Sequence, residues 1–321
     1  MLLTNPKIDG TITSVSAILN AIPRKNPTKY TVDGTIPIPP WSSWDPFDSI
    51  EWHYQGVAPY NGNGGPTIAN GCISASSTSG YFSGFSQQQG HNPGVRSVVV
   101  PDPNYYHAAG IQMLGDLLAV SLETSGSGNG KVAFYNVGQL ASPSYLYTLT
   151  MPAKKASAVG ITTYRDAGGV EQCLLVVYQY DDYQMYVYQA PAAGVGSSNP
   201  GWVLKTTYTG TALNTGDQFQ NFALVTQANA DGDVVYLLGF REDEELWLYR
   251  VDTASGSSFG HFDYIEKYTG WNGSDWRNGI GLQIADASHM RLFGTDKDPS
   301  GNSNYPNGSA SYTFHIYIYG G

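Results

Sequence analysis

The sequence predicts an all-β fold built from a unit that recurs along the chain. A small residue followed by an apolar one marks the start of each unit, at Gly56, Gly110, Gly160, Ala223 and Gly281. The marks recur every 50 to 63 residues, and short strands separated by Gly, Asn and Asp turns follow each of them. This periodicity is the sequence pattern of a β-propeller.

The strands of each unit have different characters. The first strand follows the mark, and the second is the most apolar. The third carries an aromatic side chain in one column, at Phe85, Tyr135, Tyr188, Tyr249 and Tyr317. We expect this column to pack between neighbouring blades, because a large ring buries more apolar area than any other side chain.

Five four-stranded antiparallel blades are expected, and the last needs a strand from elsewhere. The chain ends directly after the third strand of the last unit. Residues 30–38 alternate like a strand and are expected to complete that blade, closing the ring and removing its open edges. The predicted boundaries are an N-terminal arm over 1–29, with a short helix at 14–21, and one propeller domain over 30–321. Its blades are predicted at 50–102, 103–152, 153–210, 211–270 and 271–321 plus 30–38.

Composition excludes several partner classes. The net charge is −10, with 16 Lys and Arg against 26 Asp and Glu, and the longest basic cluster is Lys154-Lys155. Nucleic acid and anionic membrane are therefore disfavoured as partners. No signal-peptide pattern and no apolar run of about 18 residues is visible, so we expect no membrane insertion. The low charged fraction favours an extracellular or particle-associated location.

The two cysteines, Cys72 and Cys173, fall in second strands of units that are separated by one whole unit. A disulfide needs Cα atoms within about 7 Å, which this placement does not provide. We expect two buried free thiols.

Aromatic and acidic loops are expected to gather at one end of the propeller. The predicted ligand-binding residues are Trp41, Trp44, Tyr105, His107, Trp271 and Trp276. Acidic residues expected on the same face are Glu123, Asp181, Asp182, Asp296, Asp298 and the run 242–245. Aromatic rings beside carboxylates are a common way to hold a sugar, by stacking on its C–H face and bonding its hydroxyls. The alternative is that these rings plug the channel mouth or lock the arm.

A second set of polar residues is expected to line the central channel. Its members are His53, His107, Gln112, Ser157, Thr162, Gln220, Asn278 and Gln283. Such a column either orients a ligand or water, or fills a wet channel.

One loop is a candidate metal site. Asp296, Asp298 and Ser300 place oxygens at alternate positions, as the start of an EF-hand loop does, but Asn307 stands where the bidentate Glu should be. We therefore expect no cofactor, with calcium as the candidate ion.

Paired carboxylates on the same face are the candidates for catalysis. Glycoside hydrolysis uses two carboxyl groups about 5 Å or about 6.5–9.5 Å apart, and Asp45, Asp48 and Asp275 are the candidates. In its repeat architecture the chain resembles five-bladed propellers, some of which are furanosidases and fructan-cleaving enzymes. That resemblance carries no catalytic residue over, because no family motif matches.

The units diverge in the residues that could touch a ligand, which favours one site over five equivalent ones. We therefore predict a ligand-binding propeller that takes a carbohydrate or similar polyhydroxylated ligand. A glycoside hydrolase and a protein-interaction scaffold are the alternatives.

Overall fold

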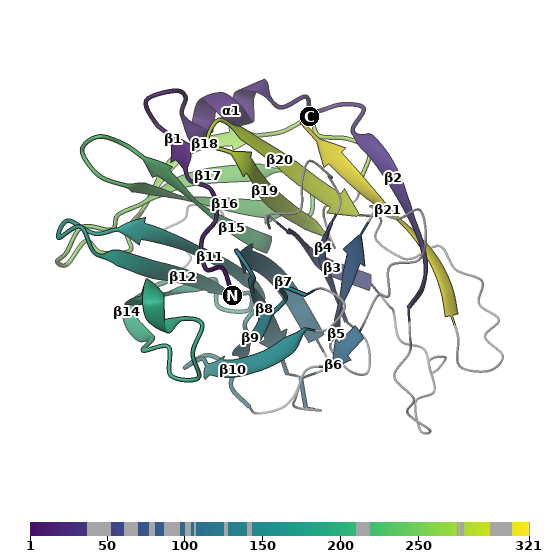
Figure 1. Cartoon of the computed structure of the whole chain (residues 1–321), viewed down its shortest axis with the longest axis horizontal. Helices are drawn as coiled ribbons and strands as arrows, with labels where there is room; N and C mark the ends of the chain where they lie inside the picture. Colours follow the sequence, from purple (N-terminus) through teal and green to yellow (C-terminus); the bar gives the residue numbers. More distant parts are fainter. Residues whose placement is uncertain are drawn as a thin grey trace.

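The computed structural model describes residues 1–36, 53–60, 70–76, 81–86, 97–99, 104–105, 107–124, 128–139, 143–209, 219–274, 276, 279–295 and 310–320. These residues form an all-β propeller with antiparallel four-stranded blades (Figure 1). In the described part of the chain, no helix is long and apolar enough to cross a membrane.

The described strands pair in four sheets. The first joins β3 (His53–Pro59), β4 (Asn70–Ser76), β5 (Tyr81–Ser86), β6 (Ser97–Val99), β7 (His107–Leu114), β8 (Leu117–Glu123), β9 (Lys131–Asn136) and β10 (Ser144–Thr150). The second holds β11 (Ala158–Arg165), β12 (Glu171–Gln179), β13 (Gln184–Pro191) and β14 (Val203–Thr209), and a 3-10 turn, Ala192–Gly194, follows β13. The third holds β1 (Ile8–Asp9), β15 (Phe219–Ala228), β16 (Val234–Arg241), β17 (Leu246–Val251) and β18 (Phe262–Tyr268). The fourth holds β19 (Ile280–Asp286), β20 (His289–Thr295), β21 (Ala310–Tyr319) and β2 (Thr28–Ile36).

The count of four described sheets corrects the expectation of five separate ones. Its cause is one bridge, in which Ser76 of β4 pairs with His107 of β7. This bridge merges the meander β3–β6 with the meander β7–β10 into one eight-stranded sheet.

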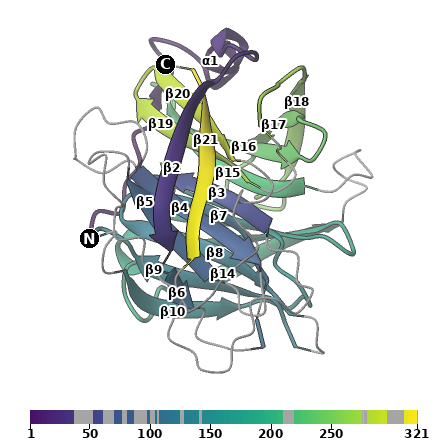
Figure 2. The same ribbon diagram turned by 90° about the vertical axis from the view of Figure 1, so that its right-hand side faces the viewer.

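The predicted strand at 30–38 overlaps β2, which is the outer strand of the fourth sheet. It pairs with β21 from Thr28↔Ile318 to Ile36↔Ala310, and the two ribbons run side by side in Figure 2. The last repeat therefore takes its fourth strand from the N-terminal part of the chain.

The expected short helix is also present. Helix α1 (Val15–Ala21) begins after Ser14, whose hydroxyl accepts a hydrogen bond from the Ala17 backbone N–H. Val15, Ile18 and Leu19 are buried in the same apolar cluster as strands β15 to β20. The arm is thus packed against the propeller.

The hydrophobic core lies in clusters between neighbouring meanders. The aromatic column contributes to them as predicted, with Tyr135, Tyr188 and Tyr249 buried in three different clusters. Cys72 and Cys173 are buried free thiols, as expected, and burial raises the pKa of both.

The small residues that mark the repeat sit where inner strands approach one another. A β-carbon added at Gly281 would overlap the Val57 carbonyl oxygen, and one at Gly110 would overlap the Asn221 side chain. The glycine marks are therefore a packing requirement of the propeller axis.

Candidate functional site

The inner strands are β3, β7, β11, β15 and β19, which contact one another between meanders. They start at one end of the axis, which we call the entry end, and turn back at the other, which we call the turn end. Gly110 donates to the Ser157 carbonyl near the entry end. Farther along, the Gln112 amide accepts from the Ile161 and Leu224 backbone N–H groups. These bonds hold strands β7, β11 and β15 side by side.

Glu123 is the hub of a polar cluster at the entry end. Its side chain is 12% exposed, and Oε2 lies 3.1 Å from Nδ1 of His107. Its Oε1 accepts a hydrogen bond from the hydroxyl of Ser157, which belongs to the next meander. The Ser157 hydroxyl oxygen in turn accepts from the Tyr180 backbone N–H at 3.2 Å. The carboxylate therefore bridges the meanders β7–β10 and β11–β14.

Electrostatics keep this carboxylate ionised. Burial alone would raise the pKa of Glu123, but His107, the Ser157 hydroxyl and the charge of Lys155 together hold it below its ordinary value. Glu123 is consequently an acceptor of hydrogen bonds at neutral pH and has no proton to donate. The ionised carboxylate accepts a hydrogen bond from His107, so Nδ1 of that ring carries a proton.

Further polar groups surround the cluster. Lys155 Nζ lies 3.0 Å from Oδ1 of Asp181. Burial, followed by the charges of Glu242, Tyr183 and Glu123, raises the pKa of Tyr180, so its hydroxyl stays protonated. The entry end thus combines hydroxyl, ammonium and imidazole groups with carboxylates, an arrangement that can both donate and accept hydrogen bonds.

The predicted channel residues are mostly used by the protein itself. The Gln112 amide also donates to the Leu224 carbonyl, and the Thr162 hydroxyl lies 2.9 Å from that of Thr226. Gln283 donates to the Tyr60 carbonyl at 3.3 Å. Gln220 is half-buried at the start of β15. The described part of this column therefore ties inner strands together, and Gln112 has its amide oxygen and nitrogen occupied by backbone.

Trp271 and Trp276 do not offer an exposed ring, which corrects their predicted role in stacking on a ligand. Both are buried, their ring centroids lie 5.1 Å apart, and each meets Tyr319 edge-on. The Arg24 guanidinium lies 5.7 Å from the Trp271 ring centroid. These tryptophans hold the arm, which is the alternative that the sequence left open.

Tyr105 is also buried. Its hydroxyl donates to the Asn129 carbonyl, and Lys131 Nζ lies 4.2 Å from its ring centroid. The ring is therefore committed to internal contacts, which corrects its expected role as a ligand-stacking residue.

Several predicted residues lie outside the described part of the chain: Trp41, Trp44, Asp45, Asp48, Asp275, Asn278, Asp296, Asp298 and Ser300. For His53 the structure describes the strand and not the side chain. In the described ranges, no group of three or more His, Cys, Asp or Glu side chains could hold a metal ion.

The sequence placed Glu123 on this face but did not pair it with His107. A regular two-residue turn at Gly115 and Asp116 would set His107 opposite Thr124. A one-residue register shift between Ala108 and Ile111 moves the partner to Glu123. The signal for this shift is Gly110, the mark residue, whose N–H bonds to the next meander instead of to β8.

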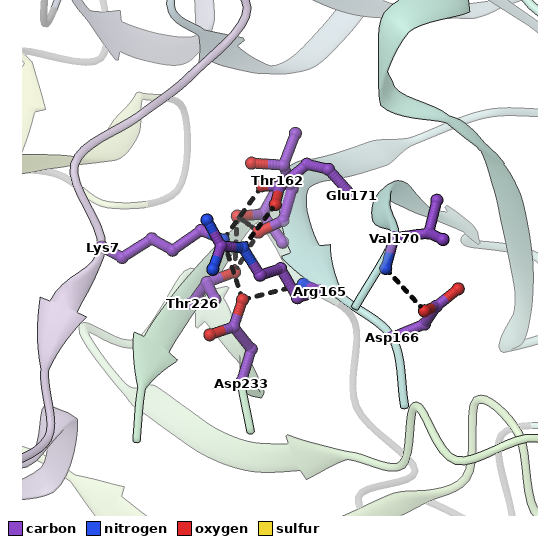
Figure 3. A network of polar contacts seen from close by, with 9 residues as sticks. Lys7, Thr162, Arg165, Asp166, Val170, Glu171, Thr226 and Asp233 are labelled. Atoms are coloured by element: carbon purple, nitrogen blue, oxygen red, sulfur yellow. Dashed lines mark hydrogen bonds and ion pairs between the residues drawn. The ribbon is translucent and has the colours of Figure 1, made fainter. Parts of the chain in front are cut away.

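The N-terminal arm contacts the hairpins of the turn end. The Asp116 backbone N–H donates to the Leu2 carbonyl, and the Leu2 N–H donates to the Asp116 carboxylate. Asn5 bonds both Met113 and Gly115. Lys7 Nζ lies 2.9 Å from Glu171 and 2.8 Å from Asp233, which joins two meanders (Figure 3). Strand β1 then pairs in parallel with the inner strand β15.

Comparisons with known proteins give little beyond the fold. No protein-family model matches the chain, and no curated protein matches it. Among solved structures it is similar to a GH62 hydrolase crystallised in complex with xylotriose, with 11% identity and a TM-score of 0.45 over 89% of this chain and 96% of that chain. A likeness this distant transfers neither the activity nor the ligand.

Proposed function

We propose that the entry end binds a neutral polyhydroxylated ligand, of which a carbohydrate is the best fit. The observation that supports this most is the half-buried, ionised Glu123 held between two meanders by His107 and Ser157. A sugar hydroxyl both donates and accepts hydrogen bonds, so it suits the entry end, where carboxylates lie beside protonated groups. The charges of Lys155 and Asp181 are already paired, which favours an uncharged ligand.

We infer a single such site. The residue in the His107 position of the next meander is Ser157, and in the one after it is Gln220. Neither repeats the pairing of imidazole with carboxylate. His53 holds this position in the meander β3–β6, and its strand partner is Ser76, so among the described residues the pairing occurs at His107 and Glu123.

We also infer that the propeller has five blades. The eight-stranded sheet divides at the bridge Ser76↔His107 into two meanders of four strands, and three further meanders follow. Strand β2 would then close the ring by completing the blade that contains β19, β20 and β21.

The predictions that the structure does not test are kept as part of this proposal. Trp41 and Trp44 are proposed to stack on the ligand. No cofactor is proposed, and calcium remains the candidate ion for the loop of Asp296. An extracellular or particle-associated location remains a prediction from composition. In the hydrolase alternative, Asp45, Asp48 or Asp275 would supply the second carboxyl group; in the scaffold alternative the same face would bind a protein.

A glycan array, run with calcium and with chelator, tests the proposal. We expect saturable binding that Glu123→Gln weakens at least tenfold. The matched control is Asp231→Asn, the same chemical change in an exposed turn at the other end. Equal binding by the two variants, or no binding to any glycan by folded protein, would contradict the proposal. Release of reducing sugar from a bound glycan would favour the hydrolase.

A further inference from the structure

Three outer strands share a bulge beside the aromatic column. The register shifts between Tyr145 and Tyr147 in β10, and equivalent shifts occur in the pairings of β14 and β18. Each shift leaves one large apolar residue opposite a column tyrosine, as Tyr145↔Tyr135, Leu204↔Tyr188 and Tyr264↔Tyr249. These outer residues are 46%, 40% and 53% exposed, respectively.

Two of the three pairs have the same ring geometry. Tyr145 meets Tyr135 edge-on, with centroids 5.7 Å apart and planes at 65°. Tyr264 meets Tyr249 with centroids 5.8 Å apart and planes at 66°. The same geometry of two tyrosine rings thus occurs on two meanders, although the units diverge in the residues that could touch a ligand.

In these two tyrosine pairs, the buried tyrosine has a hydroxyl without a hydrogen-bond partner among the described residues. Tyr135 and Tyr249 are 0% and 1% exposed, and within the described residues neither hydroxyl has a hydrogen-bond partner. Leaving such a group unpaired costs about 1–3 kcal/mol, so two instances need an explanation. The third pair lacks the feature: the Tyr188 hydroxyl lies 3.5 Å from the Met151 sulfur, and its outer residue is Leu204.

We propose that the pairs Tyr145–Tyr135 and Tyr264–Tyr249 are two equivalent surface sites for a neutral polysaccharide chain. The exposed ring stacks on the C–H face of a sugar unit, and a rotation of that ring lets a sugar hydroxyl reach the buried phenol. These sites lie on outer strands and are independent of the entry-end site.

The surroundings of both pairs favour an uncharged ligand. Beside Tyr264 the charges are closed on one another, with Arg250 bonded to Asp263 at 2.7 Å and Lys267 to Glu245 at 2.8 Å. The hydroxyl of Tyr145 lies 2.8 Å from the hydroxyl of Thr148, which is an uncharged neighbour. These ion pairs leave the named charges balanced, which favours a neutral ligand over an ionic one.

Affinity electrophoresis in native gels that contain xylan, dextran or hydroxyethyl cellulose tests the proposal. We expect at least one polymer to retard the wild-type protein, and the Tyr145→Ala/Tyr264→Ala double variant to need at least tenfold more polymer. Leu204→Ala, at the equivalent position of the third pair, should be retarded like wild type. Retardation by no polymer, or equal retardation of the double variant, would overturn the proposal.

The buried hydroxyls are tested by the double variant Tyr135→Phe/Tyr249→Phe. It should melt at the same or a higher temperature than wild type, because unpaired polar groups are removed, and yet be retarded less. Unchanged retardation would overturn the role of the hydroxyls. Glu123→Gln should be retarded like wild type, so that failure of the entry-end proposal is distinguishable. A dimer that only the Tyr145→Ala/Tyr264→Ala variant loses, without polymer binding, would assign the rings to a protein contact and overturn the proposal.

Discussion

The two ends of the propeller axis are built from the same hairpins and yet differ in chemistry. At the turn end the N-terminal arm bonds polar groups of the hairpins, through Leu2, Asn5 and Lys7. At the entry end, Glu123 and His107 face one another at the mouth. The comparison teaches that a segment outside the repeat changes the chemistry of one end of the axis and leaves that of the other end to the repeat itself.

Removal of residues 1–9 should give the largest effect, because it takes away β1 and the contacts of Leu2, Asn5 and Lys7 at the turn end. Loss of the buried Ile8 side chain and of the bonds from Asn5 and Lys7 predicts a decrease in unfolding free energy of roughly 3–6 kcal/mol. Urea denaturation measures it. A change below about 1 kcal/mol would show that the arm does not stabilise this end.

Gln112→Leu should have the next largest effect, because Gln112 ties three inner strands between the two ends. The substitution leaves two buried backbone N–H groups and one carbonyl without this partner. We expect a loss of about 2–4 kcal/mol in unfolding free energy by urea denaturation. Gln172→Leu, at a half-buried position near the exposed turn, is the control and should cost less than about 1 kcal/mol.

Lys7→Met isolates the ion pairs of the arm. It leaves the Asp233 side chain, which is largely buried, without its cation, and should cost about 1–3 kcal/mol. Thermal melts measure this loss. Lys154→Met, at an exposed position, is the control and should leave the stability close to that of wild type. Ligand binding at the entry end should be the same in both variants; a loss confined to Lys7→Met would couple the two ends.

Glu123 should make a small, pH-dependent contribution to stability. Because its pKa is lower in the folded protein, this contribution is complete above the ordinary carboxyl range and is lost as pH falls through the folded value. Melting curves from pH 7 to pH 3 should therefore fall more steeply for wild type than for Glu123→Gln, by about 1 kcal/mol in total. Parallel curves would mean that the carboxylate is not held ionised.

The sequence predicted those features of the fold that a steric rule enforces. The glycine marks could be recognised in the sequence because Gly110 and Gly281 face groups that leave no room for a β-carbon. Strand β2 is legible because the last repeat lacks an outer strand.

Contacts between segments that are distant in the sequence could not be predicted in this way. Trp271 looked available in a polar loop, and its burial depends on Tyr319 and on Arg24, about 50 residues after it and nearly 250 before it. The pairing of His107 with Glu123 depends on a bulge of one residue, which no alternation pattern records. The two-residue strand β1 is likewise too short to have a pattern.

Hydrogen–deuterium exchange with and without the glycan selected by the array tests the difference between the two ends most directly. We predict protection at His107, at residues 122–124 and at residues 155–158 and 179–183, with no change in residues 1–10 or 228–233. Protection confined to the arm and the turn end would contradict the assignment of the ligand site to the entry end.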